Sequence, residues 1–276
     1  MEDYVFDSVS SKEVTVLSKT RSRARHMEEI AEDPDVQLLT RTRFVGISEA
    51  WESDAEVDGL KVIEAAGRQC YESWSKPNPQ TAKNADYIRS LITKGHYSVL
   101  EHVDVAFRIR KVSRVLSHQL VRHRHLCFSQ RSERFVDEDD CTIIIPSIIN
   151  DDPELRDAFL RSVRDARETY RYLKTKLREK LRDFPDKTLQ KKMANEAARY
   201  VLPNATETRL VMSGNLRAWR HFVHMRSALA AGPEIRKLAL KVLRILQDEY
   251  PAVFQDFHVK VGTDGTEYAE SVHHEM

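Results

Sequence analysis

The feature that most constrains the fold is a set of apolar residues between Glu154 and Phe184 that recurs every three or four positions. Side chains with this spacing lie on one side of an α-helix, so the segment predicts a long amphipathic helix. The charged residues between them are typical of a solvated surface. The apolar positions are Leu155, Phe159, Val163, Ala166, Tyr170, Leu173, Leu177 and Leu181.

A second pattern, from Val103 to Arg110, has a period of two, because apolar and mostly polar residues alternate. This alternation is typical of a half-buried strand. Ser113 then predicts the N-cap of a helix that continues to Val121. Further strands are expected over 36–45 and 143–145, and further helices over 60–73, 86–94, 189–200, 214–228 and 233–247. Helices bracket a few strands without regular βαβ alternation, so the predicted fold class is α+β, a small central sheet flanked by helices.

The chain of 276 residues is long enough for a sizeable core. Residues 1–36 are polar and weakly patterned, which predicts a partly disordered tail, followed by a single domain over residues 37–276. Cys70, Cys127 and Cys141 are widely spaced and indicate neither a disulfide framework nor a metal site. The start of the chain resembles no secretion signal, and no apolar run is long enough to cross a bilayer, so we expect a cytoplasmic protein without a membrane partner.

The segment from Arg122 to Arg134, here called the basic tract, holds four arginines, two histidines and one acid, Glu133. Arginine donates hydrogen bonds through a planar fork that suits phosphate oxygens. The chain as a whole has 44 basic and 43 acidic residues, so the tract predicts a local anion site rather than a general polyanion binder. Neither GxGxxG nor GxxxxGK[ST] occurs, so arginine and histidine side chains would have to hold a nucleotide.

Three further clusters are polar in the same way: 95–102, Arg199 with 202–208, and 215–226. On a helix, Asn215 and Arg226 would lie near one face and could meet a ligand at its two ends. Each cluster also has a structural interpretation, since polar side chains are often satisfied within the protein. On that interpretation His102 and His118 are structural, Trp219 and Phe222 belong to the core, Arg209, Arg217 and Arg220 are solvated or paired with acids, and Glu101 and Glu207 accept N–H groups.

Arg122-His123-Arg124, followed after seven residues by Ser132, resembles the RHR-x7-S signature of the flavin-dependent thymidylate synthases. The resemblance covers roughly Val36 to Phe257, and 125–130 is similar to the actinobacterial branch. Other blocks similar to that family follow in the same order: Gly95-His96-x-Ser98-x-x-Glu101-His102, Ser113-Arg114, Ala198-Arg199-x-Val201-Leu202-Pro203, Asn215-x-Arg217, Phe222-x-x-x-Arg226 and Glu234-Ile235-Arg236.

This resemblance implies an enzyme that methylates dUMP to dTMP, with methylenetetrahydrofolate as the one-carbon donor, FAD as the cofactor and NADPH as the reductant. It also implies a homotetramer with flavin sites at the subunit interfaces. The catalytic residue would be Arg226, which would stabilise the ionised uracil ring. By the same resemblance dUMP would be held by Gln119, Arg122, Gln130, Arg131, Ser132, Arg134, Arg199 and Arg226. FAD would be held by Ser98, Arg122, His123, Arg124, Gln130, Asn215, Arg217 and His221.

The sequence departs from the family pattern at three places. Phe135 stands where tyrosine is common, and Ser129-Gln130 replaces Asn-Glu. The stretch 229–233, with Ala230 and Gly232-Pro233, replaces one that usually carries an acid and a histidine. These changes leave open weaker turnover or a shifted substrate preference.

Two other classes of protein remain open on the residues alone. An RNA-binding module could use the basic tract, although the near-zero net charge counts against it. A catalytically silent scaffold could retain nucleotide binding. Ser132 and Cys127 are expected not to attack the substrate, because no base is visibly paired with Ser132 and no specific thiolate-stabilising site is visible around Cys127.

Overall fold

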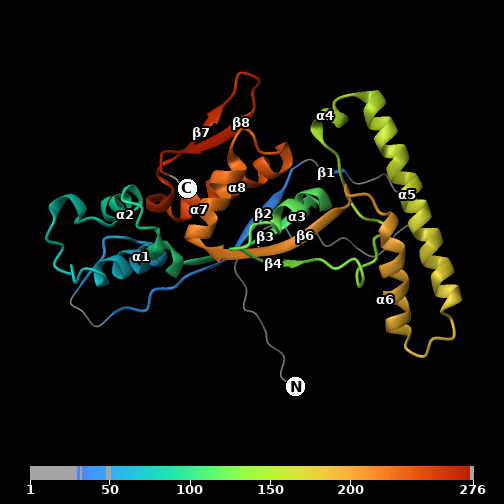
Figure 1. The fold of residues 1–276 in the computed structure, drawn as a ribbon, viewed down its shortest axis with the longest axis horizontal. Helices are drawn as coiled ribbons and strands as arrows, with labels where there is room; N and C mark the ends of the chain where they lie inside the picture. The colour runs from blue at the N-terminus through green and yellow to red at the C-terminus, as the bar shows by residue number, and fades with distance from the viewer. Residues whose placement is uncertain (1–29, 32, 48–50, 274–276) are drawn as a thin grey trace, which may run out of the picture.

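A four-stranded antiparallel sheet lies at the centre of the protein (Figure 1). The structure is a computed structural model, which describes residues 30–31, 33–47 and 51–273. The strand order of the sheet is β2 (Asp35–Arg41), β3 (Asp104–Ser113), β6 (Glu207–Asn215) and β4 (Cys127–Gln130). Every neighbouring pair is antiparallel. The predicted α+β class is confirmed. Residues 1–29, which make up most of the predicted tail, lie outside the described residues.

One face of the sheet packs against the hydrophobic core. Val105, Phe107 and Ile109 of β3 are fully buried, whereas Arg108 between them is exposed, so the period-two prediction is confirmed. The buried face is covered by α7 (Leu216–Ser227) and α8 (Pro233–Glu249), which cross above the sheet in Figure 1. A hairpin of β7 (Phe257–Val261) and β8 (Glu267–Ser271) lies beyond them.

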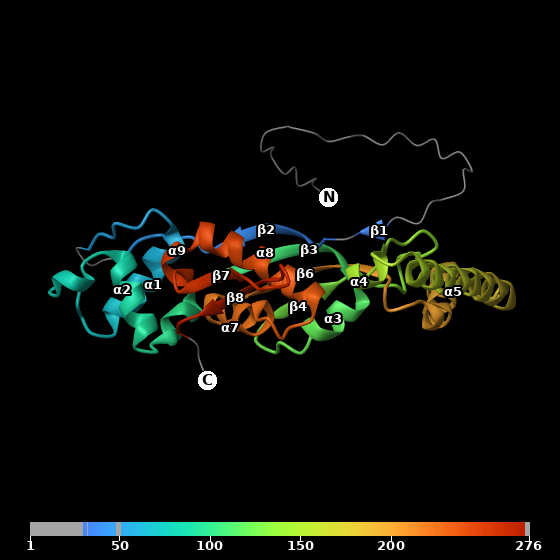
Figure 2. The ribbon, with the colours of Figure 1, turned by 90° about the horizontal axis from the view of Figure 1, so that it is seen from above.

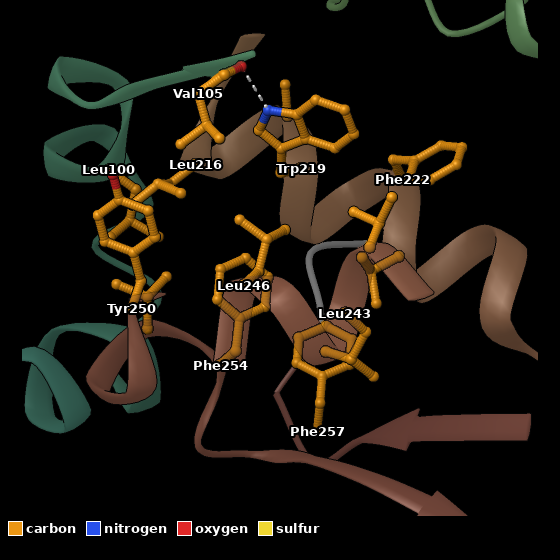
Figure 3. Close-up of a cluster of buried hydrophobic side chains, with 14 of the residues drawn as sticks. Leu100, Val105, Leu216, Trp219, Phe222, Leu243, Leu246, Tyr250, Phe254 and Phe257 are labelled. Atoms are coloured by element: carbon orange, nitrogen blue, oxygen red, sulfur yellow. Dashed lines mark hydrogen bonds between the residues drawn. The ribbon is translucent and has the colours of Figure 1, made fainter. Parts of the chain in front are cut away.

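Trp219 joins α7 to the sheet. Its indole Nε1 donates to the carbonyl oxygen of Val105 at 3.1 Å (Figure 3). Its ring also meets Phe107 edge-on, with centroids 4.9 Å apart. Phe222, one turn further along α7, packs edge-on against Trp219 with centroids 5.8 Å apart. Both residues are fully buried, so the structural interpretation of these two aromatics is confirmed.

Helices extend the molecule at both ends of the sheet (Figures 1 and 2). One end carries α1 (Asp58–Gln69) and α2 (Asn84–Thr93), with the short α9 (Pro251–Phe254) packed against α2. Gly95 follows α2 with φ = +73°, the left-handed conformation expected of a residue that ends a helix. The other end carries the antiparallel pair α5 (Pro153–Lys180) and α6 (Lys187–Ala198).

The long helix α5 confirms the predicted amphipathic helix, but its buried side is only partly apolar. Asp152 caps it by accepting the N–H groups of Glu154 and Leu155 at 2.9 and 3.1 Å, and Pro153 occupies the first turn. Leu155, expected on the buried stripe, is 50% exposed. The residues that α5 does bury are Val163, Arg167, Tyr170 and Lys174, so two of the four are basic.

Those two basic residues tie a loop to α5. Lys174 Nζ contacts the carboxylates of Asp137 and Asp139, the first at 2.7 Å, and Arg167 donates to the carbonyl oxygen of Cys141. A strict apolar pattern cannot reveal such positions, because long basic side chains can be buried when acids or carbonyls pair with them. The loop 137–141, which follows the basic tract, is therefore fixed against α5.

The remaining elements are short. Ile30–Ala31 (β1) pairs in parallel with Ile143–Ile144 (β5), so this strand lies within the segment expected to be tail. The others are α3 (Arg114–Leu120), α4 (Ser147–Asn150), η1 (Pro79–Thr81), η2 (Tyr97–His102) and η3 (Arg199–Val201). Among the described residues, no helix combines the length and apolar character that crossing a membrane requires.

Candidate active site

The first half of the basic tract leaves the C-terminal end of α3. Ser113 caps this helix as predicted, because its hydroxyl accepts the N–H of Leu116 at 3.0 Å. The carboxylate of Glu234, in the first turn of α8, accepts from the N–H and the hydroxyl of Ser113 at 2.7 and 2.6 Å. Two helices and a strand thus meet at one residue. Gln119 and Arg122, both predicted to bind dUMP, lie at the far end of α3.

His123 and Arg226 lie in direct contact, although 103 positions separate them. The Nε–H of Arg226, in the last turn of α7, donates to Nε2 of His123 at 2.8 Å. The His123 ring also meets Phe222 at 5.1 Å and His221 at 6.3 Å between centroids, both from α7. The structure therefore brings together one residue predicted to act on the substrate and two predicted to bind the flavin.

Burial, together with the nearby charges of Arg226 and His221, lowers the pKa of His123 from 6.5 to about 4. In the unfolded chain this histidine would titrate near its ordinary pKa. The unfolded state therefore binds more protons than the folded state between about pH 6.5 and pH 4, so the stability present above pH 6.5 is lost as the pH falls through this window.

We expect His123→Gln to remove this part of the acid sensitivity. For the parent, the contribution amounts to about 2 kcal/mol of unfolding free energy between pH 8 and pH 5. Urea unfolding at both pH values, at one protein concentration, measures the difference, and His258→Gln, an exposed histidine on β7, serves as the control. Equal pH slopes for the parent and His123→Gln would contradict the shifted pKa.

A hollow of about 360 Å³ lies between α1 and η2, and Ser98 and Arg217 are on its wall. His96, Tyr97 and Gly95 line it as well. Arg217 is also ion-paired with Glu101, which agrees with the structural interpretation that pairs this arginine with an acid. Asn215 caps α7 by accepting the N–H of Ala218 at 2.9 Å, so a structural role accounts for its side-chain oxygen.

The second half of the basic tract turns toward a group of buried acids. Arg131 donates to the carboxylate of Glu138 at 2.6 Å and to the carbonyl oxygen of Glu207 at 3.0 Å. Burial raises the pKa of Glu138 to about 7. The guanidinium of Arg131, predicted to bind dUMP, is thus engaged by these acids in the structure.

The acid inside the tract is held by arginines from two other elements. Glu133 is 9% exposed and lies 3.3 Å from Arg114 of α3 and 3.8 Å from Arg199 of η3. Arg134 pairs with Glu196 of α6 at 3.0 Å. Through these ion pairs Arg199 and Arg134 lie in the same region of the molecule, beside η3 and α6.

Gln130 ends β4 and points toward α3. Its amide nitrogen donates to the hydroxyls of Thr208 at 3.0 Å and Ser117 at 3.3 Å. Ser132 begins a turn, because its carbonyl oxygen accepts the N–H groups of Phe135 and Val136. Arg122 and Arg124 are exposed.

Two features of this region could not be predicted from the sequence. The contact between His123 and Arg226 joins positions too far apart for any spacing rule, and the acids Glu138 and Glu207 around Arg131 form no recognisable motif. Within the described ranges, no group of three histidine, cysteine, aspartate or glutamate side chains could hold a metal ion.

The stretch 229–233 that departs from the family pattern lies beside Gln119. A Cβ atom added at Gly232 would lie 4.0 Å from the side-chain oxygen of Gln119. Arg236 fixes the same stretch by donating to the carbonyl oxygens of Leu229 and Ala231 at 2.7 and 2.8 Å. A substitution here therefore acts next to a residue predicted to bind the nucleotide.

Comparison with known proteins defines the class to which this fold and site belong. The sequence model of the family described as "Thymidylate synthase complementing protein" matches residues 54–252. The chain therefore belongs to the flavin-dependent thymidylate synthase family, as its motifs predicted.

Relatives and a solved structure agree with this assignment. The chain is 50% identical over 237 residues to the flavin-dependent thymidylate synthase of Mycolicibacterium vanbaalenii, covering 86% of this chain and 94% of the relative. The enzyme of the same name from Mycobacterium marinum is 49% identical over the same shares. The fold is similar to that of the UMP/dUMP methylase PolB from Streptomyces cacaoi, with a TM-score of 0.62 at 21% identity, covering 82% of this chain and 95% of that one.

Proposed function

We propose that this enzyme methylates dUMP to dTMP, taking the one-carbon unit from methylenetetrahydrofolate, with FAD as the cofactor and NADPH as the reductant. Family membership supports the reaction. The single observation that carries the proposal at the level of residues is the contact of Arg226 with His123, because it joins the proposed catalytic residue to the basic tract.

The residues divide the work in this proposal. Arg226 places a fixed positive charge where the uracil ring becomes anionic, and such preorganised charge lowers the barrier to reaction at the ring. Arginine forks from the basic tract and η3 hold the phosphate and fix the nucleotide's position. No side chain forms a covalent bond to the substrate. The dUMP residues proposed are Gln119, Arg122, Gln130, Arg131, Ser132, Arg134, Arg199 and Arg226.

The residues around the hollow at η2 fit a flavin nucleotide. Ser98 and Arg217 supply a hydroxyl and a guanidinium, both suited to phosphate and ribose oxygens, and His96 adds a ring nitrogen. When bound, the flavin supplies the hydride chemistry. The residues proposed to hold it are Ser98, Arg122, His123, Arg124, Gln130, Asn215, Arg217 and His221.

The absorbance spectrum and a product assay test this proposal together. Purified protein, as prepared or after addition of FAD, should show the flavin absorbance bands, and it should form dTMP only when dUMP, methylenetetrahydrofolate and NADPH are all present. A protein that takes up no flavin and forms no dTMP overturns the proposal. RNA affinity that falls steeply with salt would point instead to the RNA-binding class.

Arg199→Ala should mainly weaken dUMP binding. Arg199 lies beside the buried carboxylate of Glu133 and is about 30% exposed, so its guanidinium can also reach a ligand. Loss of a charge-assisted hydrogen bond predicts an increase in KM for dUMP of roughly tenfold or more, with a smaller change in kcat. Steady-state kinetics with dUMP varied would check this, and a large fall in kcat at unchanged KM would contradict a binding role.

We further propose a homotetramer in which flavin lies at the subunit interfaces. Large apolar side chains are exposed around α5, α6 and the loops beside them, which is the kind of surface that a partner subunit covers. Light scattering on the purified protein measures the assembly. The exposed residues include Phe135 at 61%, Ile148 at 79%, Leu155 at 50% and Tyr200 at 84%.

A further inference from the structure

The position of His123 differs from that of its two neighbours in the RHR signature. Arg122 and Arg124 are exposed, whereas His123 is 8% exposed and turned toward α7. Its Nε2 lies 2.8 Å from Nε of Arg226, and Phe222 packs against its ring. The middle residue of the signature is therefore held inside the protein, in contact with the proposed catalytic arginine.

The chemistry of the two groups fixes the direction of this hydrogen bond. An arginine Nε always carries a hydrogen and cannot accept, so Nε2 of His123 must be the acceptor. The imidazole is then neutral, with its hydrogen on Nδ1. Burial, together with the charges of Arg226 and His221, holds the pKa of His123 at about 4, so His123 remains neutral at neutral pH.

The bond leaves the other end of Arg226 available. Within the part of the chain that the structure describes, the only hydrogen bond of Arg226 is the one from Nε to His123. Its two terminal nitrogens are therefore free to donate, and they form the planar fork that binds oxygen pairs. Fixing Nε on a rigid ring restricts where this fork can point, since Nε lies in the guanidinium plane.

We propose that His123 is a positioning residue, which accepts the Nε hydrogen of Arg226 and so directs the terminal nitrogens of that arginine at the uracil ring. The inference rests on the proposed function and goes beyond a flavin contact for His123. In this role the imidazole of His123 links the dUMP site to the flavin site, because His123 also lies beside His221, which is assigned to the flavin. Precise placement of Arg226 matters because electrostatic stabilisation depends on donors that are already oriented.

The first test separates the effect of the hydrogen-bond acceptor from the effect of side-chain volume. His123→Leu keeps a similar volume without an acceptor, whereas His123→Gln offers an amide oxygen near the position of Nε2. At saturating FAD, His123→Leu should lower kcat about tenfold to a hundredfold, the effect of losing a hydrogen bond to a charged group. His123→Gln should recover most of that loss, and His258→Gln on β7 should match the parent.

The second test asks whether His123 acts through Arg226. Affinity for dUMP is measured for the parent, His123→Leu, Arg226→Ala and the double variant, with FAD bound. We expect His123→Leu to weaken dUMP binding about tenfold when Arg226 is present and to have no further effect when it is alanine. An equal loss in both backgrounds would overturn the positioning role.

The outcomes distinguish this inference from the proposed function. An active parent whose kcat is unchanged in His123→Leu overturns the positioning role alone. Equal losses in His123→Leu and His123→Gln do so as well, because the acceptor is then irrelevant. A parent that binds flavin and dUMP but forms no dTMP overturns the proposed function, and with it a role for His123 in that reaction.

Discussion

Replacing Arg226 by alanine is expected to lower kcat for dTMP formation by at least about a hundredfold, since removing one preorganised donor at a developing anion has an effect of that size. The fold should survive, because Arg226 is only partly buried and its one hydrogen bond in the described structure is to His123. Single-turnover formation of dTMP, beside flavin content and a melting curve, measures the three properties separately.

The matched control is Arg244→Ala. Arg244 lies on α8 and pairs with Glu267 of the hairpin at 2.8 and 2.9 Å, and its side chain is 47% exposed. This variant also loses one arginine, but it should keep parental activity. If Arg226→Ala were as active as Arg244→Ala, Arg226 would not be the catalytic residue.

Replacing Arg220 by alanine is expected to produce the largest loss of stability, about 3–5 kcal/mol, because it leaves a buried acid without its partner. Arg220 contacts both carboxylate oxygens of Asp256 at 2.7 and 2.9 Å and donates to the carbonyl oxygens of Val253 and His273. Its side chain is 6% exposed and that of Asp256 is 7% exposed. Urea unfolding, at one protein concentration, measures the change.

The same Arg244→Ala variant isolates the effect of burial. Arg244 and Glu267 repeat the arginine–carboxylate chemistry of Arg220 and Asp256 at the surface, so we expect a loss below about 1 kcal/mol there. Replacing Arg220 and Asp256 together by apolar residues should cost less than Arg220→Ala alone, because no charge is then left unpaired. Similar losses in the buried and exposed variants would contradict this account.

The elements that the sequence predicted well are those in which local pattern and packing agree. The strand β3 alternates because one of its faces is buried and the other is not, and Ser113 caps α3 in the predicted way. The helices α1, α2 and α5 to α8 lie within a few residues of their predicted bounds. The membership of the family was readable from the order of short motifs, and the comparisons confirm it.

The central strand β6 was not predicted, and its residues explain why. Glu207 and Thr208 are 2% and 1% exposed, so polar side chains stand where a pattern requires apolar ones. Glu207 accepts the N–H of Lys111, which has φ = +55° and lies at an irregularity in the pairing of β3 with β6. This carboxylate therefore stabilises a bend in the neighbouring strand β3. Only the pairing with β3 makes that arrangement intelligible.

At the site, the sequence indicated candidate residues but not the side chains that each of them contacts. It assigned Arg131 to the nucleotide, whereas the fold surrounds its guanidinium with Glu138 and Glu207. It assigned His123 and Arg226 to different ligands, and the fold places them in contact. Partners of this kind depend on how α7 and α3 cross the sheet, which no local pattern encodes.

The position of Trp219 gives the protein a built-in optical reporter. Of the three tryptophans, Trp51 and Trp74 contact each other, with ring centroids 5.9 Å apart. Trp219 instead contacts Phe222, which in turn contacts His123. A flavin bound against His123 would absorb the excitation energy of the nearby indole. In a variant with phenylalanine at positions 51 and 74, tryptophan emission would therefore fall as FAD is titrated in, which yields the cofactor's affinity without any assay of catalysis.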